Sequence, residues 1–376
     1  MAIGGGAAEL TSALATLDRQ QNTRSSKRPT GGKPGWTKLI LEPELPADND
    51  SGNDKEEYSL PQQEEFVYLL EPPSTPSMVI LFLGGAGLGQ YPNIAYSEML
   101  SRISKRLNAA IIAAPYPLSL DHFDLSKKAG EALRRAVVQC EEKGNYSASL
   151  PKFYLGHSLG SKLLGIALAA SGVRDVDGIG LMSYNNFGFK NTIAMGKDFA
   201  DEFNKSQGKG GDTAGGAGGG GMGGVDLDQI LDFAGEAVSM MGFEFSPDPD
   251  AMDRIIQMKY DEQLQKKTRM FIFDDDDLDS SPSFLEACNE GSGSGPSVSR
   301  LPGKHLSPVY IKLGIDDLDL PEGARPFVSE LSGGFQNASF GDEDAMNGAV
   351  GEICNWIMGQ EPSRPPLLSG QAESKI

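Results

Sequence analysis

The 376-residue sequence predicts an α/β fold in which a mostly parallel central sheet is flanked by helices. Three observations support this prediction. Short apolar runs alternate with segments of helical length, glycine-rich turns join two of the runs to the segments that follow, and polar side chains gather just after the runs. Strands that alternate with helices are joined by right-handed crossovers, so most of the strands are expected to be parallel.

The predicted strands are short runs rich in β-branched and other apolar residues. They are expected at residues 36–41, 66–70, 78–83, 109–114, 153–155, 179–182, 269–273 and 298–301. The run at 78–83 is continuously apolar, which is typical of a strand buried in a parallel sheet. Helices are expected at residues 93–107, 126–142, 161–170, 193–204, 227–241, 249–266, 282–290 and 342–359.

A Gly-x-Ser-x-Gly turn, with Ser158 at its centre, lies between a predicted strand and an apolar helix. It is the only such turn in the chain, and its context is that of a nucleophile elbow, which presents a serine hydroxyl at the top of a sheet. The backbone N–H of Leu159 would then face a developing oxyanion. The alternative is an ordinary strand-to-helix turn in which Ser158 caps the helix.

A second glycine-rich turn, Gly84–Gly89, closes the apolar strand at 78–83. Such a turn either cradles the phosphates of a dinucleotide or supplies the second oxyanion N–H of a hydrolase. The dinucleotide fingerprint fails because Gln90 stands at the position of its last glycine. The sequence therefore favours Gly85 or Ala86 as an oxyanion donor, and the two turns together predict an α/β-hydrolase fold.

Hydrolases of this fold carry serine, acid and histidine in that order along the chain. Of the three histidines, His122 precedes the serine, and His157 is its neighbour within the elbow and cannot reach its hydroxyl. His305 follows the last predicted strand, where a general base is expected. An imidazole titrates near neutrality and can take the proton from Ser158, which is otherwise a poor nucleophile.

The acid is expected in the run of aspartates that follows the predicted strand ending at Phe273. A carboxylate there would fix the tautomer of the histidine and stabilise its charged form. Asp277, four residues past the strand end, is the predicted partner of His305, with Asp276 and Asp279 as alternatives. The predicted catalytic triad is therefore Ser158, Asp277 and His305.

The chain divides into five predicted segments. These are a disordered N-terminal segment at 1–34, the first part of the hydrolase core at 35–186, a lid insertion at 187–267, the second part of the core at 268–360 and a disordered tail at 361–376. A glycine-rich tract at 207–224 cannot pack and interrupts the helical lid. The alternative for the insertion is a unit with its own small core.

Charge and composition exclude several classes of function. The net charge of −19 makes nucleic acid a poor partner and disfavours anionic membranes. No apolar run approaches the roughly 20 residues of a membrane-spanning helix.

Three scattered cysteines have no zinc-ligand spacing and suggest a reducing compartment. No metal or organic cofactor is expected. The basic stretch at 19–34 suggests either the end of a transit peptide or a disordered tail.

Several sequence blocks between Leu81 and Pro308 resemble the domain-of-unknown-function family 1350 of cyanobacteria and plastid-bearing eukaryotes. The blocks are Phe82–Ala86 with Pro92 and Tyr96, Pro115-Tyr116 with Asp121-His122, Gly156–Gly160, Ser183–Asn186, Phe245–Pro247, Asp276–Pro282 and Gly303–Pro308. The resemblance implies an α/β-hydrolase-like fold and a plastid location, with the cytoplasm as the alternative. It implies no substrate, because the reaction of the family is not established.

Candidate substrate contacts lie in or beside the family blocks. They are His157, Asp121, His122, Asn185 and Asn186, and their alternative role is to tie loops together by hydrogen bonds. The expected function is a serine hydrolase or acyltransferase acting on an ester, thioester or amide. The insertion, rich in methionine and phenylalanine, favours a small acyl or lipid-like substrate. The alternative is a non-catalytic binding or assembly factor, and protein partners are left open.

Overall fold

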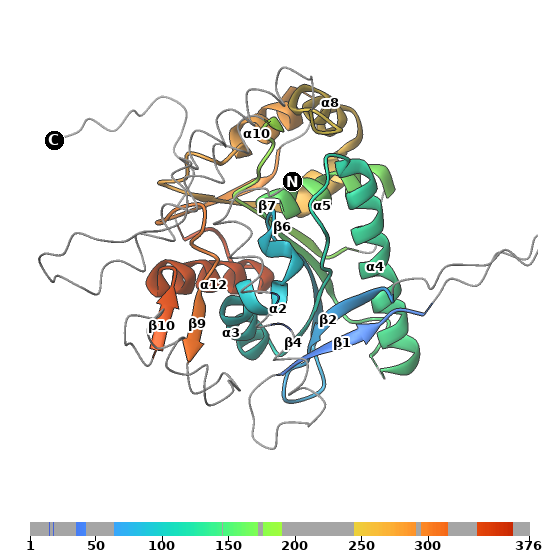
Figure 1. The fold of residues 1–376 in the computed structure, drawn as a ribbon. Helices are drawn as coiled ribbons and strands as arrows, with labels where there is room; N and C mark the ends of the chain where they lie inside the picture. The colour runs from blue at the N-terminus through green and yellow to red at the C-terminus, as the bar shows by residue number, and fades with distance from the viewer. Residues whose placement is uncertain are drawn as a thin grey trace, which may run out of the picture.

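The computed structural model describes residues 15, 18, 35–42, 64–144, 146–171, 176–189, 244–290, 295–314 and 337–363. The segments predicted at 1–34 and 361–376 fall almost wholly outside the described residues. So do the glycine-rich tract at 207–224 and the helices predicted at 193–204 and 227–241. The described residues contain the sheet and the helices that position the site (Figure 1).

The central sheet has eight strands in the order β1-β2-β4-β3-β5-β6-β7-β8. Their bounds are β1 Trp36–Ile40, β2 Phe66–Leu70, β3 Met78–Leu83, β4 Ala109–Ala113, β5 Lys152–His157, β6 Gly178–Met182, β7 Thr268–Phe273 and β8 Ser297–Leu301. β2 runs antiparallel to both β1 and β4, and the other neighbours are parallel. All eight predicted strands are confirmed, each within one or two residues at either end.

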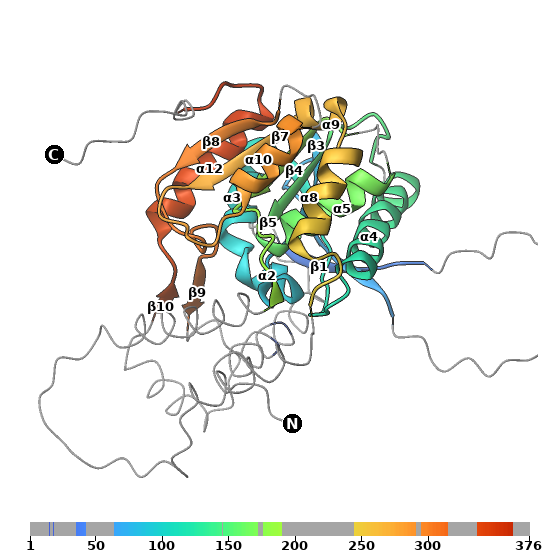
Figure 2. The same ribbon diagram turned by 90° about the horizontal axis from the view of Figure 1, so that it is seen from above.

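Helices cover both faces of the sheet, as Figure 2 shows with α4, α5 and α8 on one side and α3 and α12 on the other. The helices are η1 Leu88–Gln90, α2 Pro92–Ala95, α3 Ser97–Leu107, α4 His122–Lys143, α5 Leu159–Ser171, α8 Pro249–Lys259, α9 Glu262–Lys267, α10 Ser281–Glu290 and α12 Glu343–Ile357. A small second sheet pairs β9 Ile311–Gly314 with β10 Asn337–Phe340.

Strand β3 shows how the sequence builds this layered arrangement. Successive side chains of a strand point to opposite faces, so an unbroken apolar run feeds two cores at once. Leu81 and Leu83 pack in the cluster beneath α4, α5 and α8. Ile80 and Phe82 pack in the cluster beneath α3 and α12. The central strand therefore has no solvated face, and its carboxyl end leads into the turn that contains Gly85 and Ala86.

Helices α4 and α5 begin earlier than predicted, because the apolar pattern used for the prediction starts only after their first residues. α4 begins at His122 rather than at 126, since Asp121 accepts a hydrogen bond from the N–H of Asp124. α5 begins at Leu159 rather than at 161, immediately after the serine of the elbow. Both helices follow strands that run in the same direction, β4 and β5, so their first residues lie at the same end of the sheet.

The lid boundary requires a correction. The predicted lid extended to residue 267, but Met252 and Ile256 of α8 and Leu264 of α9 are buried in the same core as α5 and α10. This part of the insertion is thus a helix layer of the core itself. The apolar spacing of these helices fits a lid and a core layer equally well, and packing decides between them.

The strand order, the antiparallel first strands and the turn after β5 are those of the α/β-hydrolase fold, as predicted. Polar side chains that follow β5, β6, β7 and β8 gather at one edge of the sheet. Among the helices that the structure describes, none combines the length and the apolar character needed to cross a membrane.

Candidate active site

The turn between β5 and α5 holds Ser158 in a left-handed backbone conformation, with φ of 54°. Two glycines make so tight a turn sterically feasible. A Cβ at Gly156 would lie 2.8 Å from the Cα of Ser161, and one at Gly160 would lie 2.2 Å from the carbonyl oxygen of Leu83. No other residue type fits these two positions, and the strained serine is the feature expected of a nucleophile elbow.

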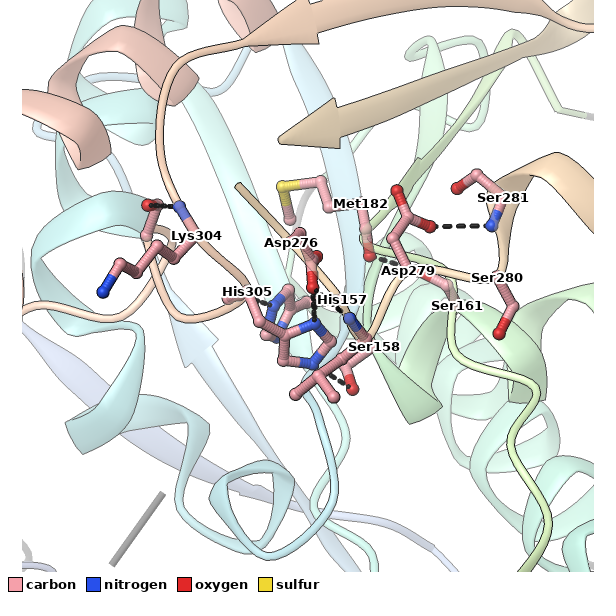
Figure 3. Close-up of polar contacts among 12 residues, drawn as sticks. His157, Ser158, Ser161, Met182, Asp276, Asp279, Ser280, Ser281, Lys304 and His305 are labelled. Atoms are coloured by element: carbon pink, nitrogen blue, oxygen red, sulfur yellow. Dashed lines mark hydrogen bonds and ion pairs between the residues drawn. The ribbon is translucent and has the colours of Figure 1, made fainter. Parts of the chain in front are cut away.

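Three side chains from different turns form a continuous hydrogen-bonded line (Figure 3). Nε2 of His305 lies 2.9 Å from Oγ of Ser158, and its Nδ1 lies 3.0 Å from each carboxylate oxygen of Asp276. An ionised carboxylate only accepts, so the Nδ1–H of His305 donates to Asp276. Nε2 is then left to accept the Ser158 O–H, which is the arrangement that draws a proton from a hydroxyl.

The Asp276 carboxylate is fully buried, yet it stays ionised. Burial raises its pKa, but the hydrogen bond and charge of His305 and the N–H of Leu278 outweigh that effect. The net pKa of Asp276 is therefore below its ordinary value. A buried, ionised carboxylate against Nδ1 favours a positive charge on the imidazole, as proton transfer from a serine would require.

The prediction of Asp277 as the partner of His305 is wrong. Asp277 is exposed, whereas Asp276 lies against the imidazole. For two residues beyond the end of β7, the chain stays hydrogen-bonded to β8 and to the turn after it. The N–H groups of Asp274 and Asp275 donate to the carbonyls of Leu301 and Gly303. The turn that follows directs the next side chain, that of Asp276, inward.

Asp279, the other alternative, performs a local structural task. Its Oδ1 accepts the N–H of Ser281 at 2.7 Å, at the start of α10. Burial raises the pKa of Asp279 to about 6, and the nearby Asp276 charge adds to the effect. In Figure 3 its carboxyl group points away from His305 and toward Ser281.

His157 does not face the cavity described below; instead it connects three loops beneath the site. Its Nε2 lies 2.8 Å from the carbonyl oxygen of His305, which can only accept, so Nε2 carries the proton. Nδ1 then accepts from the hydroxyl of Tyr96 at 2.8 Å, and that hydroxyl accepts the N–H of Gly85 at 2.7 Å. The sequence reasoning missed Tyr96 as a part of this network.

This network also corrects one predicted oxyanion donor. The N–H of Gly85 is engaged by Tyr96 and is not free to bind an oxyanion. Ala86 and Leu159 both line the cavity next to Ser158. Leu159 is the first residue of α5, so its N–H has no carbonyl acceptor within the helix. The pair that fits the role is therefore Ala86 with Leu159.

Acid is expected to destabilise the protein through His157. Burial lowers its pKa to about 3 from 6.5, and the charge of His305 adds to this effect. The stabilisation from keeping the imidazole neutral is complete above pH 6.5 and is lost as the pH falls toward 3. At pH 5 the loss is roughly 2 kcal/mol, at about 1.4 kcal/mol per pH unit.

The check is the free energy of unfolding at pH 7 and pH 5 for the wild type and for His157→Gln. Glutamine keeps a donor and an acceptor but does not titrate, so its loss should be smaller by about that amount. Equal losses in the two proteins would contradict the assignment of this acid sensitivity to His157.

A cavity of about 350 Å³ opens beside Ser158. Its lining residues come from the loops after β3 and after β6, the loop before α4 with the first residue of that helix, the elbow with α5, and the segment before α8. They are Ala86, Leu118, Ser119, Leu120, His122, Ser158, Leu159, Lys162, Asn185, Phe187, Phe189 and Phe245. The walls are mostly apolar. A small ester or acyl chain fits a cavity of this size and character.

The remaining predicted contact residues divide into two groups. His122 and Asn185 line the cavity. The side chain of Asp121 caps its own helix, α4, whereas Asn186 donates to the carbonyl of Pro249 and to Asp253 and so ties two segments together. Sequence reasoning missed Lys162, although a lysine one helical turn after Ser158 in an otherwise apolar helix was a visible signal.

Residues 65–317 match the family described as "Protein of unknown function (DUF1350)". This range contains Ser158, Asp276 and His305, the three residues of the hydrogen-bonded line. Among curated proteins, none matches the chain.

Solved structures of α/β-hydrolases resemble the chain at low sequence identity. A carboxyl esterase from Tuber melanosporum is 14% identical with a TM-score of 0.43, covering 83% of this chain and 89% of the esterase. A peroxisomal α/β-hydrolase from Saccharomyces cerevisiae is 10% identical with a TM-score of 0.41, covering 90% and 93%. A dienelactone hydrolase from Anabaena variabilis is 10% identical with a TM-score of 0.42, covering 88% and 99%.

Proposed function

The chain belongs to the DUF1350 family, and from the geometry of its site we propose that it is a serine hydrolase or acyltransferase acting on an ester, thioester or amide. One observation supports this proposal above all others. Ser158, His305 and Asp276 are joined at hydrogen-bond distance, with the imidazole nitrogens in the order that nucleophilic catalysis needs.

The first half of the proposed reaction forms an acyl-enzyme. Oγ of Ser158 attacks the carbonyl carbon while its proton passes to Nε2 of His305. The N–H groups of Ala86 and Leu159 hold the oxyanion of the tetrahedral intermediate. As the intermediate collapses, the bond to the leaving group breaks, and His305 gives its proton to the departing alcohol, thiol or amine.

The second half releases the acyl group. Water gives a proton to His305 and attacks the acyl carbon, and the bond to Oγ breaks as His305 returns the proton to Ser158. The product is a carboxylic acid. In an acyltransferase a second alcohol, thiol or amine takes the place of this water. Throughout both halves Asp276 keeps the imidazole in the tautomer that faces Ser158.

The test is covalent labelling of the full chain by a fluorophosphonate probe, together with hydrolysis of p-nitrophenyl acetate. A serine hydrolase of known activity in the same tube controls for the probe, and the small ester controls for access to the cavity. Labelling or turnover above the uncatalysed rate is expected. If the folded protein shows neither labelling nor ester hydrolysis, the result would favour a binding or assembly factor that has the fold but no catalytic activity.

A further inference from the structure

Lys162 lies one helical turn after Ser158 on α5. The N–H of Lys162 donates to the carbonyl of Ser158, which stands just before the helix, and both of these side chains line the same cavity. The Lys162 side chain is 1% exposed, although an ammonium group is among the most costly groups to bury. Its position places a positive charge within the cavity that holds the nucleophile.

The ammonium of Lys162 has spare hydrogen-bonding capacity. Nζ donates to the carbonyl oxygen of Pro247 at 3.0 Å, and it makes no ion pair with a carboxylate of the described residues. An ammonium has three N–H donors, so two remain for another acceptor. The buried ammonium thus makes one of its three possible hydrogen bonds with the protein. Leaving the other two donors without acceptors costs free energy unless a ligand in the cavity accepts from them.

Three carboxylates, those of Glu244, Asp248 and Asp253, keep Lys162 charged from a distance. Burial lowers the pKa of Lys162 to about 8, and these charges hold it from falling further, so the ammonium persists at neutral pH. Each carboxylate is already bonded elsewhere: Glu244 to the N–H of Phe189 and of Phe245, Asp248 to that of Ala251, and Asp253 to Asn186 and Ser283.

His122 supplies a second polar group in the same cavity. It is 2% exposed, and neither ring nitrogen has a hydrogen-bond partner among the described residues. Its ring stacks on Phe245 with centroids 4.3 Å apart, and Nζ of Lys162 lies 6.0 Å from the centre of that same Phe245 ring. Burial and the charge of Lys162 keep the imidazole neutral, so it offers one donor and one acceptor.

We propose that the cavity takes an ester or thioester whose acyl chain ends in a carboxylate, held by Lys162 and His122 while Ser158 attacks the acyl carbon. One carboxylate oxygen accepts from the ammonium and the other from the imidazole N–H. One positive charge matches a singly charged carboxylate better than a doubly charged phosphate. The apolar walls suit the methylene chain between, and the acyl part is the part that stays bound through both half-reactions.

The inference rests on the proposed function, and its test compares a negatively charged ester with a neutral ester that is larger by one methyl group. These are mono-p-nitrophenyl glutarate and its neutral methyl ester, p-nitrophenyl methyl glutarate. The wild type should have at least a tenfold higher kcat/KM for the charged ester. In Lys162→Met, which keeps an unbranched side chain of similar length, that preference should fall at least tenfold. A hydrogen bond to a charged group accounts for a change of this size.

Two further variants control the comparison. Lys105→Met removes a charge from an exposed position on α3, on the opposite face of the sheet, and should leave the preference unchanged. His122→Phe keeps a ring against Phe245 but removes the N–H, and should lower the preference. It also tests the site if Lys162→Met does not fold. A wild type without preference for the charged ester would overturn the inference.

Binding separates this inference from the proposed function. Monomethyl glutarate should bind the Ser158→Ala variant, measured by calorimetry, and more weakly when Lys162→Met is added. Binding of monomethyl glutarate without any ester turnover by the wild type would support the carboxylate site and contradict the proposed hydrolase activity. Ester turnover without a preference for the charged ester would support the hydrolase activity and contradict the carboxylate site. A phosphonate analogue of the same length that is preferred over the carboxylate would overturn the assignment of a carboxylate.

Discussion

Replacing Ser158 by alanine is expected to abolish fluorophosphonate labelling and to lower kcat for p-nitrophenyl esters by about 10⁴- to 10⁶-fold. Removal of the nucleophile alone costs nearly as much as removal of a whole triad, because its members act as a unit. Turnover that remains would come from the oxyanion donors and from binding. The variant should fold, since alanine at a position with φ of 54° loses only a hydroxyl.

Ser161→Ala is the matched control. Ser161 is a buried serine in the first turn of α5, three residues after Ser158, but its hydroxyl donates to the carbonyl of Met182 at 3.1 Å and not to a histidine. Labelling of this variant should persist at the wild-type level. The assignment of Ser158 as the nucleophile would be contradicted if Ser158→Ala were still labelled, or if only Ser161→Ala lost its labelling.

Replacing Asp276 by asparagine should lower kcat by about 10³- to 10⁴-fold while the protein stays folded. An amide cannot stabilise an imidazolium, and it allows the tautomer of His305 whose Nε2–H points at Ser158. That tautomer cannot accept the serine proton. The readout is kcat and KM for the same esters, with KM expected to change little, because Asp276 contacts the imidazole rather than the substrate.

Asp277→Asn makes the same chemical change one residue along the chain, at an exposed side chain. It should leave kcat within about twofold, since exposed substitutions of this kind have small effects. A large loss from Asp277→Asn together with near-normal turnover by Asp276→Asn would show that the described loop is not the active conformation.

The fold was predictable because each central strand is a run of apolar residues between clear breaks. β3 is the extreme case, buried on both faces, and β4 follows the same rule. The pair of short strands β9 and β10 was not predicted. The end of the insertion was also missed, because α8 carries the same amphipathic spacing whether it covers a cavity or packs on a core.

The site was predictable only as far as chain order and strand ends define it. Ser158 and His305 were located from the elbow and from the loop after the last strand. The acid was not, because four consecutive aspartates are chemically equivalent in a sequence, and only the turn after β7 decides which one points inward. Gly85 was missed as a structural donor for a similar reason, since its partner Tyr96 lies eleven residues away, between α2 and α3.

Buried hydrogen bonds run from the backbone N–H of Gly85 through the side chains of Tyr96 and His157 to the backbone carbonyl of His305, so a substitution can alter only the two middle members. Replacing Tyr96 or His157 alone leaves a buried donor or acceptor of the other without a partner, at a cost of about 1–3 kcal/mol. Two exchanges at adjoining members share that cost instead of adding it. A double variant at Tyr96 and His157 should therefore lose less stability than the sum of the losses of the two single variants.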